Sequence, residues 1–127
     1  MNDVGRVVNP MIVRGQLDGG AVQGIGQALG EQVVYDRDTA QLLTASFMDY
    51  NMPRADIIRD FVHLLDQSIP CRNNPLGAKG VGELGTIGAT PAVVNAVLDA
   101  LVRAGRASHA EKLQMPLTPA KLWEALH

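Results

Sequence analysis

Apolar residues recur at helical spacing first in the stretch that follows Asp18. Val22, Ile25 and Leu29 fall on one face of a helix, so we expect a helix that begins near Gly19. Asp18 is suited to cap it, because its carboxylate can accept hydrogen bonds from the free N–H groups of the first turn. Several glycines lie inside this stretch, and each weakens a helix by roughly 1 kcal/mol relative to alanine. A helix that tolerates them is expected to pack closely against another backbone or a ligand.

The clearest helical pattern lies in the last third of the chain. Thr90 is suited to cap this helix and Pro91 to open it, because proline lacks only an N–H group that the first turn leaves unpaired. Asp99 and Arg103 are an i, i+4 pair on the polar face, and Gly105 ends the helix. The expected apolar face consists of Val94, Val97, Leu98 and Leu101.

Two further elements have local signals. A short last helix is predicted over 120–126, with Thr118 as its cap. Two apolar runs, 31–35 and 41–45, flank the polar sequence 36–39, which predicts a strand–turn–strand hairpin.

The remaining segments have weaker signals. Residues 3–10 are expected to be extended up to a turn at Asn9-Pro10. Residues 57–65 fit either a strand or a helix, and a strand is favoured. Residues 68–89 have no periodicity, and a loop of that length in a compact domain indicates either a functional segment or a wrong assignment of its elements. These elements indicate the α+β class: a small, mainly antiparallel sheet with about three helices on one side, in a single domain of residues 1–127.

Composition excludes several functional classes. A formal net charge of -2 and 4% aromatic residues leave no basic patch or stacking platform for nucleic acid. No apolar run approaches the roughly 20 residues of a membrane span, and no secretory signal opens the chain. A cytoplasmic location is therefore expected, although the sequence alone does not separate the cytoplasm from the periplasm. Cys71 is alone, so this chain offers neither a disulfide framework nor an iron–sulfur site.

The glycine-rich stretch 77–88 is the strongest candidate for chemistry. It surrounds one acid, Glu83, and one base, Lys79. A carboxylate held by glycine backbone just before a helix could be pressed against a bound group and act as a general base. The alternative is a surface turn whose charged side chains merely face solvent, as such residues usually do.

Other chemical motifs are weaker. Gly80, Gly82 and Gly85 match the dinucleotide pattern G-x-G-x-x-G, but no apolar strand precedes them, which argues against a stand-alone nucleotide-binding protein. The three histidines show no ligand spacing, so no metal site is expected from side chains. Cys71 has no histidine partner nearby and is interpreted as a plain thiol.

An ordered series of motifs resembles one family. The motifs are Asp3-Val4-Gly5, Asn9-Pro10, the run from Gly15 to Gly26, Met48-Asp49-Tyr50, Met52-Pro53, Asn74-Pro75-Leu76-Gly77, Lys79-Gly80-Val81-Gly82-Glu83 and Met115-Pro116-Leu117-Thr118-Pro119. In this order they resemble the C-terminal part of the molybdopterin-binding large subunits of molybdenum hydroxylases. That family includes xanthine dehydrogenases, aldehyde oxidoreductases and aerobic carbon monoxide dehydrogenases. The resemblance covers nearly the whole chain.

The resemblance implies a role for several residues. Glu83 matches the family's catalytic base, which accepts a proton from water or hydroxide at the molybdenum. Gln23, followed by Gly24, matches a glutamine that contacts the pterin cofactor. In the family, a stretch of backbone lies against the cofactor near the metal, and the residues that match it here are Lys79, Gly80, Val81 and Gly82. The cofactor is commonly the cytosine dinucleotide form of molybdopterin in bacterial members.

The family's large subunits are several times longer than this chain. We therefore expect a C-terminal fragment of a molybdenum-cofactor domain that has no turnover and binds no cofactor alone. Its expected partners are the remainder of the molybdenum subunit, iron–sulfur and possibly flavin subunits, or further copies through exposed strand edges. The complete enzyme would oxidise an aldehyde or an N-heterocycle with oxygen from water. The alternative is a non-catalytic binding or assembly module derived from the same family.

Overall fold

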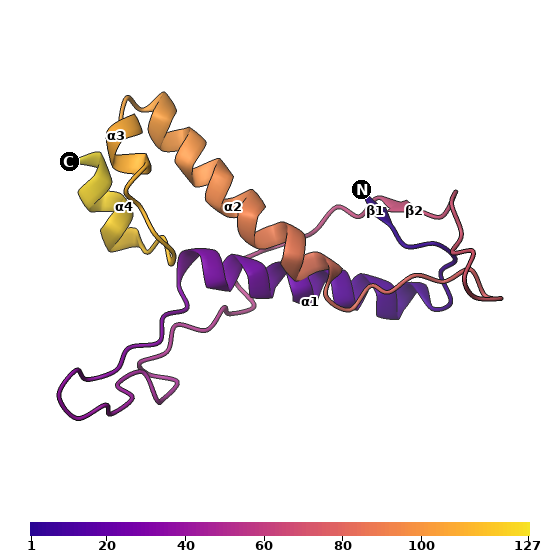
Figure 1. The fold of residues 1–127 in the computed structure, drawn as a ribbon, viewed down its shortest axis with the longest axis horizontal. Helices are drawn as coiled ribbons and strands as arrows, with labels where there is room; N and C mark the ends of the chain where they lie inside the picture. The colour runs from indigo at the N-terminus through magenta and orange to yellow at the C-terminus, as the bar shows by residue number, and fades with distance from the viewer.

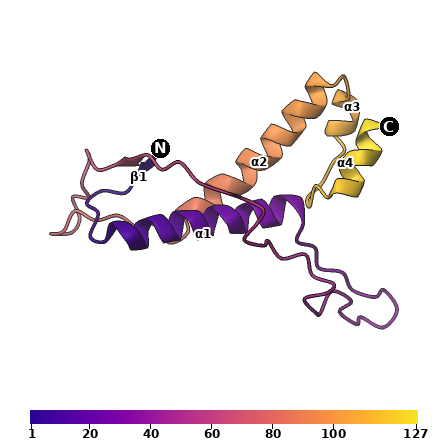
Figure 2. The ribbon, with the colours of Figure 1, turned by 180° about the vertical axis from the view of Figure 1, so that it is seen from behind.

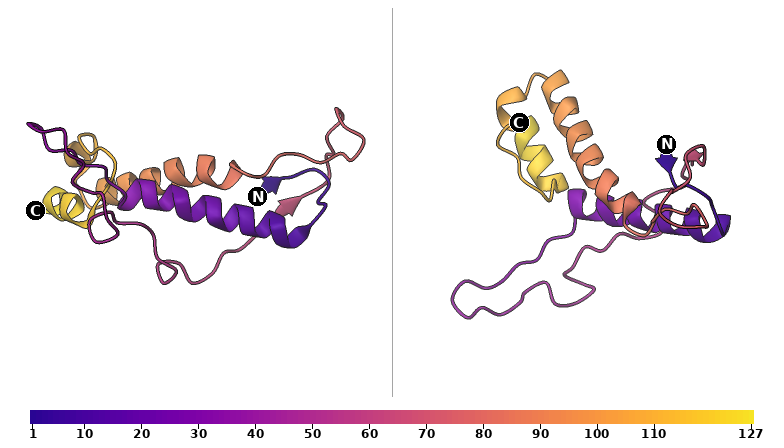
Figure 3. Two further views of the ribbon diagram at one scale, coloured as in Figure 1. Left: turned by 90° about the horizontal axis from the view of Figure 1, so that it is seen from below. Right: turned by 45° about the vertical axis from the view of Figure 1, so that its right-hand side comes forward.

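The computed structural model describes all 127 residues as an open frame built around two long helices that cross (Figure 1). The elements in chain order are β1 (Asn2–Asp3), α1 (Pro10–Leu29), β2 (Leu65–Asp66), α2 (Leu84–Arg103), α3 (Ala107–Ala110) and α4 (Pro119–Leu126). α2 starts on the middle of α1 and diverges from it, and α3 and α4 fold back beside its far end (Figures 1 and 3). The α+β class is therefore confirmed.

The start of α1 differs from the prediction. The helix begins at Pro10, and Asn9 caps it by accepting bonds from the N–H groups of Met11 (3.1 Å) and Ile12 (3.2 Å). The predicted start near Gly19 with Asp18 as cap is wrong, because Asn9-Pro10 is a cap followed by a first-turn proline and not a turn. The residues that α1 buries are Val13, Leu17, Gly20, Gly24, Gly26 and Ala28.

The start of α2 also differs. The sequence predicts Thr90 as its cap and Pro91 as its first residue, but the helix begins seven residues before Pro91, at Leu84. Pro91 therefore lies inside the helix, where it removes one N–H donor of the helical hydrogen-bond pattern. The predicted end is confirmed: Gly105 has a φ of +77°, and Arg103 Nε lies 2.7 Å from Asp99 Oδ2. α4 is capped by the Thr118 hydroxyl, also as predicted.

The sheet is parallel, which corrects the expectation of a mainly antiparallel one. β1 pairs with β2 in the register Asn2–Leu65 and Asp3–Asp66, and two residues after β1 Gly5 forms a single antiparallel bridge with Ala78. The sheet joins segments more than 60 residues apart in the chain, so periodicity within any one segment could not reveal it.

The two other strand predictions have mixed outcomes. The predicted hairpin is reduced to one antiparallel bridge between Tyr35 and Leu42, supported by the bond from Leu43 N–H to the Val34 carbonyl (2.8 Å). Residues 57–65, for which a strand was favoured, contribute only Leu65 to β2. Residues 31–57 form an arm that extends away from the crossing helices (Figures 1 and 2).

The buried part of the molecule is small. Only 13 of 127 residues are buried, and they include two separate apolar clusters. One cluster, Val4, Val13 and Leu17, lies under the sheet, and the other, Leu101, Ala110 and Ala125, joins the C-terminal helices. The accessible surface is 9312 Å², whereas a compact monomer of this length exposes about 6,600 Å². Much apolar surface is therefore open to a partner.

α2 is by length and composition apolar enough to cross a membrane. Small residues interrupt its larger apolar ones, so the sequence shows no continuous run of large apolar residues there. Leu101 is the only buried residue of this helix, and Asp99 and Arg103 lie on its exposed side. The expectation that the chain has no membrane span stays a prediction.

Candidate functional site

Glu83 is at the head of α2, in the N-cap position. Its side chain is exposed and caps no backbone N–H group, while its carbonyl accepts the bond from Ile87 N–H at 3.1 Å. The backbone of Glu83 is thus part of the first helical turn, but its carboxylate has no partner in the chain. This carboxylate is available to a group that approaches the end of the helix.

The loop that leads to Glu83 is attached to the N-terminal segment. The N–H group of Arg6 donates to the Gly77 carbonyl at 2.9 Å, and the N–H group of Lys79 donates to the Val4 carbonyl at 3.3 Å. Gly77 has a φ of +70°, a conformation that residues with a side chain rarely adopt. These bonds explain why a stretch without periodicity has a defined path.

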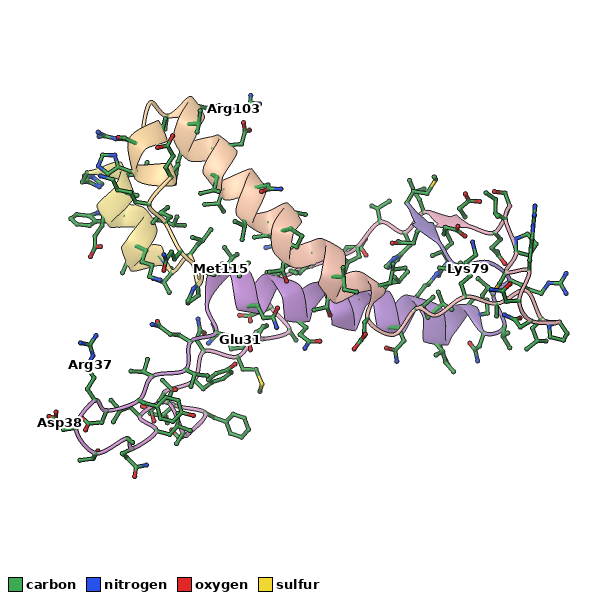
Figure 4. All side chains as sticks on the ribbon, in the orientation of Figure 1. Glu31, Arg37, Asp38, Lys79, Arg103 and Met115 are labelled. Atoms are coloured by element: carbon green, nitrogen blue, oxygen red, sulfur yellow. The ribbon has the colours of Figure 1, made fainter.

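Side chains add to this attachment. Lys79 Nζ lies 2.6 Å from Asp3 Oδ2, and this bond holds the pKa of Asp3 below its usual value (Figure 4 labels Lys79). The Asn74 side chain accepts a bond from the Ala78 N–H group (3.2 Å) and donates one to the Ala78 carbonyl (3.0 Å). Lys79 therefore holds the loop through its side chain and faces a site only through its backbone.

The backbone just before α2 and in its first turn has N–H groups without a hydrogen-bond partner. None of the N–H groups from Gly80 to Thr86 donates to an acceptor in the chain. A Cβ atom added to Gly80 or Gly82 would meet nothing within 4 Å, so the backbone here is open to solvent. A helix start preceded by free N–H groups is a favourable place for an anionic group. The segment matched to the cofactor from sequence, 79–82, provides those of residues 80–82, whereas the Lys79 N–H group donates to Val4.

The crossing of α1 and α2 depends on glycine. A Cβ atom on Gly20 would lie 3.0 Å from the Thr86 nitrogen, and one on Gly24 would lie 2.8 Å from the Ala89 Cβ. A Cβ atom on Gly85 would lie 2.9 Å from the nitrogen of Ala21. The two backbones therefore touch here, which confirms the expected close packing of this glycine-rich helix.

Gln23 lies beside this crossing and close to the head of α2. Its side chain is exposed, and its Oε1 atom is 3.2 Å from the Thr86 hydroxyl oxygen. Thr86 follows Glu83 by three residues, and residues at that spacing share a helical face. Through Thr86, Gln23 is therefore connected to the first turn of α2, which Glu83 precedes, although Gln23 and Glu83 are 60 positions apart in the sequence.

Two features were missed from sequence. Thr86 was not singled out, although Thr86 and Thr90 share the four-residue spacing of Gly20 and Gly24. The other is His63, whose Nε2 atom lies 2.7 Å from Asp18 Oδ1. The contact is close, although Asp18 Oδ1 accepts no well-aligned hydrogen bond. It fastens the segment before β2 to α1.

Known proteins match the chain along most of its length. Residues 1–59 match the molybdopterin cofactor-binding domain family. The large subunit of nicotine 6-hydroxylase from Paenarthrobacter nicotinovorans is 42% identical over 125 residues, which are 98% of this chain and 15% of that protein. Subunit gamma of the 6-hydroxypseudooxynicotine dehydrogenase complex from the same organism is 40% identical over 121 residues, 95% of this chain and 14% of that protein.

Solved structures match in the same proportion. A Cu,Mo-containing carbon monoxide dehydrogenase superposes with a TM-score of 0.85 at 35% identity, over 98% of this chain and 16% of that one. Quinoline 2-oxidoreductase from Pseudomonas putida 86 superposes with a TM-score of 0.80 at 40% identity, over 98% of this chain and 15% of that one. The chain thus spans about a seventh of the length of the relatives it matches.

Proposed function

The chain belongs to the molybdopterin-binding large-subunit family of xanthine dehydrogenases, aldehyde oxidoreductases and aerobic carbon monoxide dehydrogenases, and we propose that it supplies the active-site base of such an enzyme. Glu83 is that base. The observation that supports this role is its free carboxylate at the head of a 20-residue helix, one turn before the Thr86 hydroxyl that contacts Gln23. A base must be free to reach the proton it accepts, and Glu83 has no competing partner in the chain.

The residues present fit a phosphate-bearing pterin. The unpaired N–H groups of the open backbone at Gly80 and Gly82 are donors for its anionic part, and the exposed Gln23 amide is a further contact. Gly24 contributes indirectly: because it has no side chain, α1 and α2 can pack closely, and this packing sets the position of Gln23. A cytosine dinucleotide form of the cofactor would bring a second phosphate to these donors and belongs to the same proposal.

When bound, the molybdenum cofactor supplies the two-electron oxidation and the activation of water. No three His, Cys, Asp or Glu side chains group together in the chain, so in this proposal the pterin and not the protein holds the metal. Glu83 accepts a proton from the water that is consumed, and the helix head keeps the carboxylate at a fixed distance from the 80–82 backbone. The loop fastened by Lys79 and Asn74 prevents that backbone from moving away.

The proposed reaction replaces a C–H bond of an aldehyde or an N-heterocycle with C–OH. One water is consumed, and two electrons and two protons are released. The electrons pass to iron–sulfur and possibly flavin groups on partner subunits, because this chain has only one cysteine. The names of several relatives, nicotine 6-hydroxylase and quinoline 2-oxidoreductase among them, are in keeping with an N-heterocyclic substrate. A cytoplasmic location remains a prediction.

The remainder of the molybdenum subunit is the proposed cover for the open surface. The chain exposes about 2,700 Å² more than a compact monomer of its length. Exposed apolar side chains lie on the arm, where Phe47 is 88% and Met48 94% exposed, and on α2. In isolation the chain is expected to be inactive and free of cofactor. A purely assembly-related role has less support, because the loop before Glu83 is tightly fastened and Gln23 lies beside it.

Co-expression tests this function. We expect the chain to purify with the rest of its molybdenum subunit as a complex that contains molybdenum and pterin, and to contain neither when expressed alone. A chain that binds neither partner nor cofactor in either case would contradict the proposal. A chain that forms the complex and leaves its cofactor content unchanged when residues 80–82 are replaced would instead indicate the assembly role.

A further inference from the structure

Thr86 contacts two groups of α1 through one hydroxyl. Its Oγ1 atom lies 3.0 Å from the Gly20 carbonyl oxygen and 3.2 Å from Gln23 Oε1, so its proton is within reach of both acceptors. The contact is possible because Gly20 has no side chain: a Cβ atom there would be 3.0 Å from the Thr86 nitrogen. The Thr86 hydroxyl therefore joins the backbone of α1, the amide of Gln23 and the first turn of α2.

Thr90 repeats this arrangement one turn later. Its Oγ1 atom lies 3.4 Å from the Gly24 carbonyl oxygen, 3.2 Å from Gln27 Oε1 and 3.3 Å from the Thr86 carbonyl oxygen. The two threonines thus form two rungs across the same helix crossing. They are chemically alike, and they differ in their distance along α2 from Glu83.

The Thr86 rung is the nearer of the two to the head of α2. Lys79 is the last loop residue with a bond to the N-terminal segment, and Gly80 and Gly82 lie in open space. The next hydrogen bond to another element after Lys79 is therefore the one made by Thr86. Since Glu83 is one turn before Thr86, a shift of this turn along α1 would move the carboxylate with it.

We propose that Thr86 is a positioning residue, which orients the Gln23 amide toward the pterin and fixes Glu83 relative to it. The Thr86 hydroxyl holds the carboxamide oxygen of Gln23, so the amide N–H groups are left as donors for the cofactor. This inference rests on the proposed function, because it concerns how that site is held in place. In this proposal Thr90 stabilises the helix crossing and has no role in positioning Gln23 or Glu83.

The test uses the assembled, cofactor-containing enzyme with Thr86→Val, Thr86→Ser and Thr90→Val. Valine has nearly the shape of threonine but cannot donate a hydrogen bond, and serine restores the hydroxyl. For Thr86→Val we expect less molybdenum and pterin per protein and a loss of about tenfold to a hundredfold in kcat per bound molybdenum, with KM within about twofold. Thr86→Ser should recover most of both. Thr90→Val should lower the midpoint of thermal unfolding similarly but leave kcat per molybdenum within about twofold.

Equal losses of kcat per molybdenum in Thr86→Val and Thr90→Val would overturn the inference, and so would an unchanged Thr86→Val enzyme. Gln23→Met supplies a second measurement that does not depend on a fully stable Thr86→Val enzyme. Because Thr86 acts through Gln23 on cofactor retention, Gln23→Met alone and Gln23→Met with Thr86→Ala should retain the same molybdenum. Additive losses would contradict this coupling. Failure of either test leaves the role of Glu83 intact, since that role is tested by substitution of Glu83 itself.

Discussion

Lys79 and Asp3 are distant in sequence and form one of the few long-range ion pairs of the molecule. The pair is only partly exposed on the lysine side, and it fastens the loop that precedes Glu83 to the strand β1. The bond from Lys79, followed by a backbone bond from Gly5, holds the pKa of Asp3 below its usual value. Protonation of the Asp3 carboxylate can therefore weaken the attachment of the loop that leads to Glu83.

The sign of this pH dependence follows from the lowered pKa. The pair contributes stability above the unfolded pKa of an aspartate, about 3.9, and that contribution is lost as pH falls through the lower folded pKa. We expect the Lys79 amide, which donates to Val4, to exchange its hydrogen faster as pH falls below about 4 than intrinsic exchange predicts. Hydrogen exchange followed by NMR measures this directly.

Two variants make this test specific. Asp3→Asn should remove the acid dependence at Lys79 but leave the dependence at Ser68, whose N–H group bonds Asp66 and lowers the pKa of that carboxyl. Asp38→Asn, at an exposed turn where the carboxylate accepts no bond, should change neither. Unaltered acid sensitivity of the Lys79 amide in Asp3→Asn would show that the ion pair does not hold the loop.

The two long helices meet through glycine, and this is the main structural feature at the scale of elements. Gly20 and Gly24 touch α2, whereas Gly15 and Gly19, in the same helix, have nothing within 4 Å of an added Cβ atom. The same residue type thus has opposite roles within one helix. On the crossing face it permits contact, and on the open face it only weakens the helix.

Alanine substitutions separate these roles. Gly20→Ala and Gly24→Ala should each destabilise the crossing by about 1 to 3 kcal/mol, because the new methyl group meets the backbone of α2. Gly15→Ala and Gly19→Ala should stabilise α1 by roughly 0.5 to 1 kcal/mol. Hydrogen exchange of the α1 amides in the purified chain reports these free energies. A uniform effect of all four substitutions would refute the packing argument.

Helices were predictable where their signals are local. The cap at Thr118, the stop at Gly105 and the Asp99–Arg103 pair each depend on residues a few positions apart, and all three are present. The starts of α1 and α2 were misplaced because Asn9-Pro10 and Thr90-Pro91 each fit two interpretations. Tertiary contact decides the second case: the turns before Pro91 are held against α1.

The candidate site was predictable only through the resemblance. Composition and spacing left Glu83 as either a base or a solvated loop residue, and nothing local connected it with Gln23. The connection is made by Thr86 across the glycine crossing, which is a contact between segments 63 residues apart. The parallel sheet beside the loop also joins distant segments, and its strands are only two residues long. Neither strand could therefore be predicted from a local pattern.

At the scale of the whole molecule, the open frame is its main property. The molecule has only two small clusters of buried apolar residues and an accessible surface of 9312 Å². The arm of residues 31–57 extends from one end (Figure 3). Within this arm, Tyr50 donates a bond to Glu31 at 2.5 Å, which raises the pKa of the tyrosine and joins the two ends of the arm close to α1. An open shape of this kind is expected for one part of a larger subunit, and the relatives are about seven times as long as this chain.

The most direct measurement is the turnover of the assembled enzyme with Glu83→Gln, normalised to its molybdenum content. Glutamine has nearly the shape of glutamate but cannot accept the proton, so we expect molybdenum content to be retained and turnover to fall by about 10² to 10⁴. Glu124→Gln, an exposed position on α4, is the matched control and should keep full activity. An enzyme that keeps its rate per molybdenum after Glu83→Gln would contradict the assignment of Glu83 as the base.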